Sequence, residues 1–190
     1  GTANGSLVLG SNSSLRVGTV DDPALVNIGM NQSSGYGPTY SGGSGTGLLD
    51  ATQGQVEFHL SELNVGRHTG WYGTATGTLR WDQADPIDAD KVYFGRGPST
   101  GILEVPEGGT FLLGAADDPL SVLGISYHDT GDTSHSGGAS AAHLDFSVTD
   151  PTFEAFVSDD LSIGRKASTV GLGTANGSLV LGSNSSLRVG

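Results

Sequence analysis

Nine carboxylates recur at one position of a repeated pattern and could bind a cation together. Each falls in the turn that we expect before an apolar segment ending in glycine, and they are Asp21, Asp22, Glu62, Asp88, Asp90, Asp117, Asp118, Asp159 and Asp160. If these segments stack in register, charges about 5 Å apart repel one another by about 1 kcal/mol in water. A Ca²⁺ ion, with about six to eight oxygen ligands, would offset that repulsion. The alternative is a solvated acidic edge that keeps the protein soluble, since no strict calcium-loop signature is present.

Aromatic residues form a second candidate site, for a sugar. They lie among small polar residues, in connections whose length varies from repeat to repeat, and they are Tyr36, Tyr40, Trp71, Tyr72 and Tyr127. Loops on a rigid scaffold often carry function, and aromatic faces beside hydroxyls suit a saccharide groove. The alternative is that these rings pack on their own loops or contact a neighbouring filament.

A third set of residues could form the active site of an enzyme. Asp50, Arg80, Glu104 and Asp145 occupy matching outward positions of a repeated strand pattern. Two carboxylates on adjacent strands could act as acid and base on a polysaccharide. A cross-strand charge pair explains Arg80 between two acids more simply. The sequence has no cysteine, no phosphate-binding glycine loop and no serine–histidine–aspartate pattern, so we expect no enzyme, no catalytic residues and no cofactor apart from the candidate Ca²⁺.

The elements that position these residues follow a repeated frame, glycine-x-leucine-x-apolar. It occurs at residues 5–9, 47–51, 77–81 and 101–105, and at 142–146 with alanine in place of glycine. The leucine and the last apolar residue alternate with variable positions, which indicates a strand with one buried face.

Two further frames follow the first in constant order. An apolar-x-apolar-glycine frame ends at Gly29, Gly66, Gly95 and Gly164, and a version around Gly124 is out of step by one residue. Between the two lies an apolar pair, which is Leu15 and Val17, Val56 and Phe58, Phe111 and Leu113, or Phe153 and Phe156, with a weak match at Ile87. The three frames, taken together as one repeated unit, therefore predict three short strands per unit.

Three strands per unit without helices predict an all-β fold, a right-handed parallel β-helix with about five coils per period. We expect a right-handed coil because crossover connections between parallel strands are almost always right-handed. An antiparallel β-sandwich also uses many short strands, but it does not explain three frames in constant order.

The chain contains an exact internal repeat. Residues 1–18 (GTANGSLVLGSNSSLRVG) return unchanged as residues 173–190, an offset of 172. We expect residues 1–172 to be one solenoid period and residues 173–190 to begin the next, unless the segment was duplicated artificially. The expected partners are further copies, either covalently joined in tandem or stacked end to end.

The charge of the chain argues against two classes of partner, nucleic acids and anionic membranes. With 20 acidic and 8 basic residues and a net charge of −12, the chain is a poor ligand for nucleic acid or an anionic membrane. No segment reaches transmembrane length, and no signal peptide is recognisable.

The runs GTGTL…VYFGR and SGGSGTGLLD…LNVGR resemble repeats of large bacterial extracellular β-solenoid proteins. Autotransporter passenger domains and filamentous-haemagglutinin-like adhesins are the relatives that this resemblance suggests. It implies an extracellular or cell-surface location and a role as a structural repeat of a filament or adhesin that contacts glycans or neighbouring filaments. It carries over no catalytic residues. The alternative function is a carbohydrate-binding or polysaccharide-degrading β-helix protein.

Overall fold

The computed structural model describes residues 1–32, 42–70, 72–129, 138–167 and 173–190. Within these residues the regular structure is entirely β, and no helix is long and apolar enough to cross a membrane. The strands are β1 (Thr2–Val8), β2 (Ser14–Val17), β3 (Ala24–Asn31), β4 (Ser44–Ala51), β5 (Gln55–His68), β6 (Thr74–Trp81), β7 (Asp88–Ala89), β8 (Lys91–Arg96), β9 (Ser99–Glu104), β10 (Thr110–Leu113), β11 (Leu120–His128), β12 (Ala139–Asp145), β13 (Thr152–Lys166), β14 (Thr174–Val180) and β15 (Ser185–Val189).

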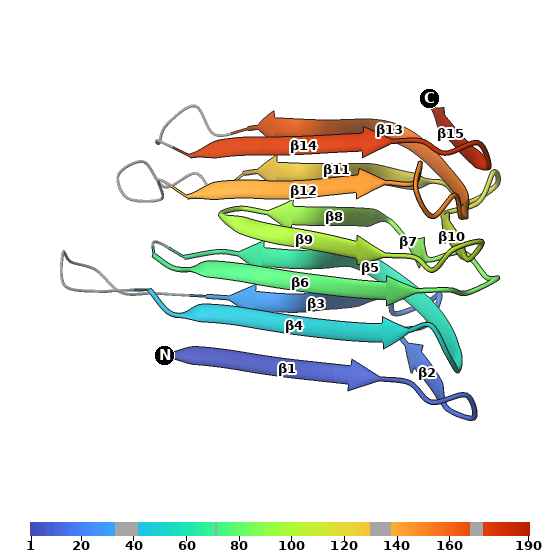
Figure 1. Ribbon diagram of the computed structural model, residues 1–190, viewed down its shortest axis with the longest axis horizontal. Helices are drawn as coiled ribbons and strands as arrows, with labels where there is room; N and C mark the ends of the chain where they lie inside the picture. Colours follow the sequence, from blue (N-terminus) through green and yellow to red (C-terminus); the bar gives the residue numbers. More distant parts are fainter. Residues whose placement is uncertain (33–41, 71, 130–137, 168–172) are drawn as a thin grey trace.

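The strands form two parallel sheets, and the chain crosses from one to the other along its length (Figure 1). The six-stranded sheet has the order β1-β4-β6-β9-β12-β14, so its strand order follows the sequence. The nine-stranded sheet has the order β10-β13-β11-β8-β5-β2, with β3, β7 and β15 attached to β5 and β13. Every pair between named strands is parallel, which contradicts the antiparallel sandwich alternative.

The glycine-x-leucine-x-apolar frames coincide with the strands of the six-stranded sheet. Leu49 pairs with Leu79, and Leu79 pairs with Leu103, so the leucines form a column. Leu79 and Trp81 are fully buried, and Leu144 and Phe146 are almost so. The predicted inward face is therefore confirmed in the central strands. Burial of each such side chain contributes about 1.5–3 kcal/mol.

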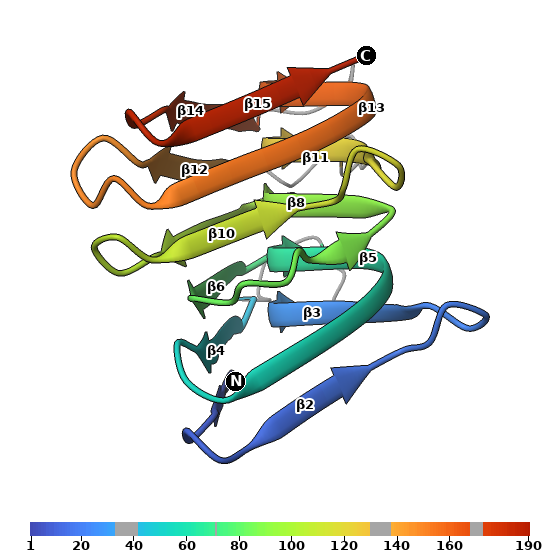
Figure 2. The same ribbon diagram turned by 90° about the vertical axis from the view of Figure 1, so that its right-hand side faces the viewer.

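The second and third strands are not separate in every unit. β5 and β13 are single strands of 14 and 15 residues, and each spans both predicted strands (Figure 2). Between β2 and β3 and between β10 and β11, where several residues separate the strands, the chain has the sequence Asp-Asp-Pro at residues 21–23 and 117–119. β7 and β8 are separated by Asp90 alone. Proline has no N–H to donate to a ladder, whereas the matching parts of β5 and β13 lack proline and continue as strands.

One predicted core residue points outward. Phe153 is buried, but Phe156 is only partly buried and lies 5.3 Å from the guanidinium of Arg188. Ala155 and Val157 fill the inward positions instead, because strand alternation from Phe153 selects odd-numbered residues. Phe153 stacks on Phe146 with ring centroids 4.4 Å apart, which joins the two sheets within the core.

The frame that appeared out of step around Gly124 is regular in the structure. Leu123 and Ile125 are the buried pair, and they align with Val92 and Phe94 of β8. The residue that follows this pair is therefore Ser126, which has a φ of 60°. Gly29, Gly66, Gly95 and Gly164 have φ values of 65–77° at the same point of their strands. A serine thus replaces the expected glycine, and Gly124 itself is an outward residue.

Candidate functional site

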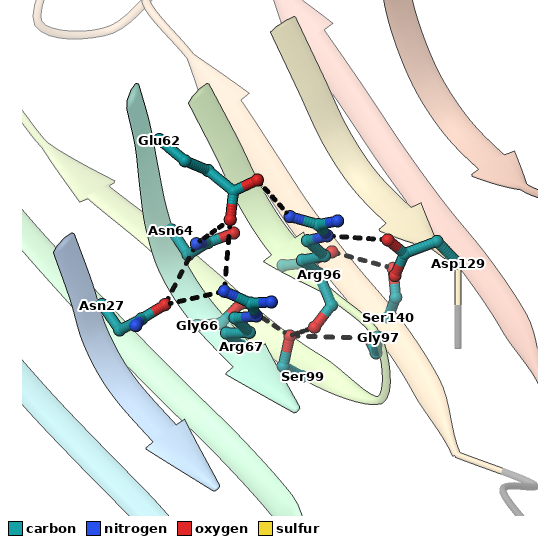
Figure 3. Close-up of polar contacts among 11 residues, drawn as sticks. Asn27, Glu62, Asn64, Gly66, Arg67, Arg96, Gly97, Ser99, Asp129 and Ser140 are labelled. Carbon is teal, nitrogen blue, oxygen red and sulfur yellow. Dashed lines mark hydrogen bonds and ion pairs between the residues drawn. The ribbon is translucent and has the colours of Figure 1, made fainter. Parts of the chain in front are cut away.

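Outward side chains of the third strands gather into a polar ladder around Glu62, Arg67 and Arg96 (Figure 3). The apolar-x-apolar-glycine frame positions them, because Leu63 and Val65 point into the core and Glu62 and Asn64 point away from it. Gly66, at a φ of 77°, then bends the strand so that Arg67 follows on the outer face.

The ladder is a continuous set of polar and charge-assisted contacts that links four neighbouring strands. Nη1 of Arg67 lies 3.2 Å from Oε1 of Glu62, and Nη1 of Arg96 lies 2.6 Å from Oε2 of the same carboxylate. On its other side, Nε of Arg96 donates to Oδ2 of Asp129 over 2.7 Å. Asn64 joins the set by donating to Glu62 over 2.8 Å and to Asn27 over 3.0 Å. These contacts bind β3, β5, β8 and the end of β11 together.

The same arrangement recurs on β13. Arg165 forms an ion pair with Asp160, five residues earlier in the chain, as Arg67 does with Glu62. Ser162 stands in the place of Asn64 and donates to Asp160 over 2.8 Å. The acid-x-polar-x-x-arginine spacing therefore forms an ion pair within a single third strand, in both β5 and β13.

Burial shapes the electrostatics of this ladder. Desolvation opposes ionisation of Glu62, but the hydrogen bond from Asn64 and the charges of Arg96 and Arg67 outweigh it and lower its pKa. Burial also raises the pKa of Tyr93 to about 12. The guanidinium of Arg96 lies 4.4 Å from the centre of the Tyr93 ring, a cation–π contact. A Cβ at Gly124 would lie 2.5 Å from this ring, so glycine leaves the space that the ring occupies.

The chemistry available to the ladder is mutual neutralisation. Both partly buried arginines face carboxylates, and Glu62 is held in its ionised form. A general acid needs a carboxyl whose pKa is raised, and the ladder has the opposite arrangement. We therefore interpret these residues as a brace between strands.

The predicted calcium stripe is not gathered into a ligand set among the residues that the structure describes. No three His, Cys, Asp or Glu side chains there are grouped so that they could hold a metal ion. Asp88 contacts His59, Asp90 contacts Lys91 over 3.4 Å, and Glu62 and Asp160 pair with arginines. Glu62, Asp159 and Asp160 also lie within β5 and β13, not in turns as expected. The remaining four acids, Asp21, Asp22, Asp117 and Asp118, occupy the Asp-Pro turns.

The structure reveals two kinds of histidine that the sequence did not distinguish. On the surface, Nδ1 of His59 lies 2.6 Å from Asp88, and its Nε2 lies 3.3 Å from Glu57, which also binds Arg16. The hydrogen bond with Asp88 raises the pKa of His59, and Glu57 adds to the effect. By contrast, His68 and His128 are buried at the ends of β5 and β11, and desolvation lowers the pKa of each.

The predicted aromatic site is only partly described. Tyr36, Tyr40 and Trp71 lie outside the described residues. The carbonyl of Tyr72 lies 3.1 Å from Nε2 of His68. Tyr127 belongs to β11, not to a loop, and its ring lies 5.3 Å from that of Tyr93. Strand periodicity in SVLGISYH could have placed Tyr127 on β11.

Arg80 forms charge pairs within the outward ladder of the six-stranded sheet. Arg80 donates from Nε to Glu104 over 2.5 Å, and its Nη1 lies 3.6 Å from Oδ2 of Asp50. Asp145 accepts hydrogen bonds from the amide and hydroxyl of Ser147, which lower its pKa. The cross-strand pairing predicted for Arg80 is confirmed.

Comparisons of the chain with protein-family models, with curated proteins and with solved structures find no match. Function must therefore be argued from the arrangement of the strands and their edges.

Proposed function

We propose that residues 1–172 are one period of an elongated right-handed β-solenoid, and that this period is a structural repeat of a filament or adhesin at the cell surface. A solenoid stacks units so that each contacts only its neighbours. The sequential strand order of the six-stranded sheet supports this reading, since a strand from each successive unit is added to the same edge. On this interpretation each coil holds three strand segments, which are fused in β5 and β13.

The observation that carries the proposal is the conformation of the exact repeat. Residues 2–8 and 174–180 are both strands, and they are the first and last strands of the same sheet. The turns after them are alike too, since Gly10 donates to the hydroxyl of Ser13 and Gly182 to that of Ser185, each over 2.9 Å. One sequence therefore takes one structure at two levels of a stack. An offset of 172 residues corresponds to an advance along that stack.

The resemblance to extracellular β-solenoid repeats supports the cell-surface role. Acidic residues outnumber basic ones by 20 to 8, which favours solubility of a long particle and disfavours binding to nucleic acid. The polar ladder supports a mechanical role as well, because it braces successive strands on the outer face. Glycans and neighbouring filaments are the contacts that we expect at the connections between coils.

The length and location of the native polypeptide test this function. We expect a denaturing gel of the source cells to show a chain several periods long, and protease treatment of intact cells to remove it. Negative-stain images should show rods whose length grows with the number of periods. A compact, single-period protein inside the cell would contradict the proposal. Saccharide binding that depends on Tyr72 or Glu104 would favour the carbohydrate-binding alternative.

A further inference from the structure

The first and last copies of the repeated segment are each covered on one side only, and the sides are opposite. Leu9 is 7% exposed because the next unit packs over it, whereas its counterpart Leu181 is 43% exposed. Conversely, Leu7 is 46% exposed, while its counterpart Leu179 is partly buried against the core. Within the described residues, β1 pairs only with β4, and β14 pairs only with β12. Each copy thus lacks the neighbour that the other copy has.

The uncovered side of the first copy is apolar and hollow. We define the N-terminal face as the open edge made by β1, β2 and β3. It contains a pocket of about 500 Å³ whose apolar lining includes Leu7, Leu15, Val17, Val26, Ile28 and Phe58. Apolar side chains exposed together at the end of a core mark an interaction surface. The edge of a parallel sheet also offers unpaired backbone groups to a further strand.

The structure also contains the surface on which this sequence sits. Residues 174–180 pair in register with Ala139–Asp145 of β12, and residues 185–189 pair with residues 153–157 of β13. Phe146 donates its N–H to the carbonyl of Val180 over 2.9 Å. We call this surface, made by β12, β13 and the turn between them, the seat.

Side chains of the seat contact both the strand β14 and the turn that follows it. Asp150, at a φ of 40°, accepts hydrogen bonds from the hydroxyl of Ser183 over 2.6 Å and from the amide of Asn184 over 3.2 Å. His143 contacts the hydroxyl of Ser178 over 2.8 Å. The counterparts of these three partners in the first copy are Ser6, Ser11 and Asn12, and all three are exposed.

Two glycines of the repeat are needed at the seat and not at the first copy. A Cβ at Gly177 would lie 2.6 Å from the amide nitrogen of Gly164 in β13, and a Cβ at Gly182 would lie 2.4 Å from the carbonyl oxygen of Phe146. At Gly5 a Cβ would meet nothing within 4 Å, and at Gly10 only its own turn at 3.5 Å. The first copy therefore fits the seat as the last copy does.

We propose that the N-terminal face is an interface for a second copy of this chain: when residues 173–190 of that copy leave its seat, its β12 and β13 cover the face in the register that β14 and β15 show. Ser6 then lies beside His143 of the second copy, Ser11 and Asn12 beside its Asp150, and Leu7 becomes buried. This inference deepens the proposed function and rests on it for its biological setting, but the contact itself can be tested with single chains.

A glycine substitution that frees the seat tests the interface. In the full chain, Gly177→Val should release residues 173–190 from the seat, so that residues 1–18 of another molecule can enter it. We expect head-to-tail oligomers by analytical ultracentrifugation, at concentrations where the wild-type chain does not associate. The matched variant Gly5→Val/Gly177→Val should stay unassociated, because neither copy of the segment then fits. Equal behaviour of the single and double variants would overturn the proposal.

Peptide capture gives a second readout that does not depend on assembly. A labelled peptide of residues 1–18 should bind Gly177→Val at least ten-fold more tightly than the same peptide carrying Gly5→Val, and it should dissolve the oligomers. Circular dichroism checks that the variant folds, and Gly177→Ala with Gly5→Ala serves as the milder pair if it does not. Equal binding of the two peptides would contradict the proposed seat.

Disulfide trapping tests the register. In the Gly177→Val background, Ser6→Cys with His143→Cys should give a ladder of cross-linked chains on a non-reducing gel. Ser6→Cys alone should give none, and a dimer there would mean that two N-terminal faces meet, which would overturn the proposal. If the variant chains associate but the native polypeptide proves to be short and intracellular, the proposed function is refuted and the interface is retained. A long surface polypeptide with no association would refute the interface alone.

Discussion

Ser126 of β11 and Ser140 of β12 meet between the two sheets, with their hydroxyl oxygens 2.8 Å apart and both side chains fully buried. The hydroxyl of Ser126 also lies 2.9 Å from the carbonyl oxygen of Ser140, and that of Ser140 donates to the carbonyl of Gly95 over 3.1 Å. Glycine occupies the position of Ser126 in the other third strands. Here a hydroxyl offsets the strain of a positive φ by satisfying a buried partner.

We predict different losses of stability for two substitutions of Ser126. Ser126→Ala keeps the strain and loses the buried hydrogen bond, so it should lower the free energy of unfolding by about 1–2 kcal/mol. Ser126→Gly loses the bond but relieves the strain, and should stay within about 0.5 kcal/mol of wild type. Urea denaturation measures both. Ser121→Ala, which removes an exposed hydrogen bond to the carbonyl of Asp90, is the control and should have little effect.

Gly66 tests how tightly the sheets approach. At a φ of 77°, its added Cβ would lie 2.2 Å from the carbonyl oxygen of Thr100. Gly66→Ala should therefore cost about 3 kcal/mol or more, from strain and overlap together. Gly108 has a φ of 66° with nothing near its Cβ position, so Gly108→Ala isolates the strain and should cost about 1 kcal/mol. Equal losses in thermal or urea unfolding would show that the approach of the sheets is looser than described.

Arg96 should contribute more to stability than Arg165. The side chain of Arg96 is 19% exposed and meets both Glu62 and Asp129, whereas that of Arg165 is 48% exposed and meets Asp160. Arg96→Leu removes the positive charge that faces the carboxylates of Glu62 and Asp129, and it should lower the free energy of unfolding by about 2 kcal/mol. Arg165→Leu should cost less than about 1 kcal/mol, because water screens the pair. High salt should reduce only the smaller loss of stability, that of Arg165→Leu. A larger loss for Arg165→Leu than for Arg96→Leu would contradict the brace interpretation.

Acid should destabilise the fold through its buried histidines. Burial lowers the folded-state pKa of His68 and of His128 below the usual value, to which the unfolded chain is close. The unfolded chain therefore binds protons first, and stability should fall as the pH drops below about 6.5. His68→Asn should flatten this fall between pH 7.5 and 5. A slope equal to that of wild type would show that His68 does not contribute.

His59 provides a control of the opposite sign. Its folded-state pKa is raised by Asp88, so the stability that it adds is fully present below about pH 6.5 and is lost as the pH rises through the folded-state pKa. His59→Gln should thus lower stability at pH 5 more than at pH 8. Parallel urea titrations at the two pH values measure the difference, and a larger loss at pH 8 would contradict this assignment.

The sequence by itself determined the strands, their parallel stacking and most of the core. Alternation around Leu49, Leu79 and Leu144 is a local property of a strand, so it identified the inward face before any contact was known. The exact repeat of residues 1–18 at residues 173–190 is likewise a property of the sequence alone. Local pattern was wrong where a strand runs through a predicted turn, as at Glu62, because this part of the chain has no proline to interrupt β5.

Only the tertiary structure decided which side chains meet. Glu62 reaches Arg96, and Arg96 reaches Asp129, through strands that are adjacent in space and separated by more than 30 residues. The structure also showed that Ser126, not Gly124, takes the left-handed position. Register decides both results, because a shift of one residue exchanges the two faces of a strand. Stacking sets that register for the whole sheet, and no single segment specifies it alone.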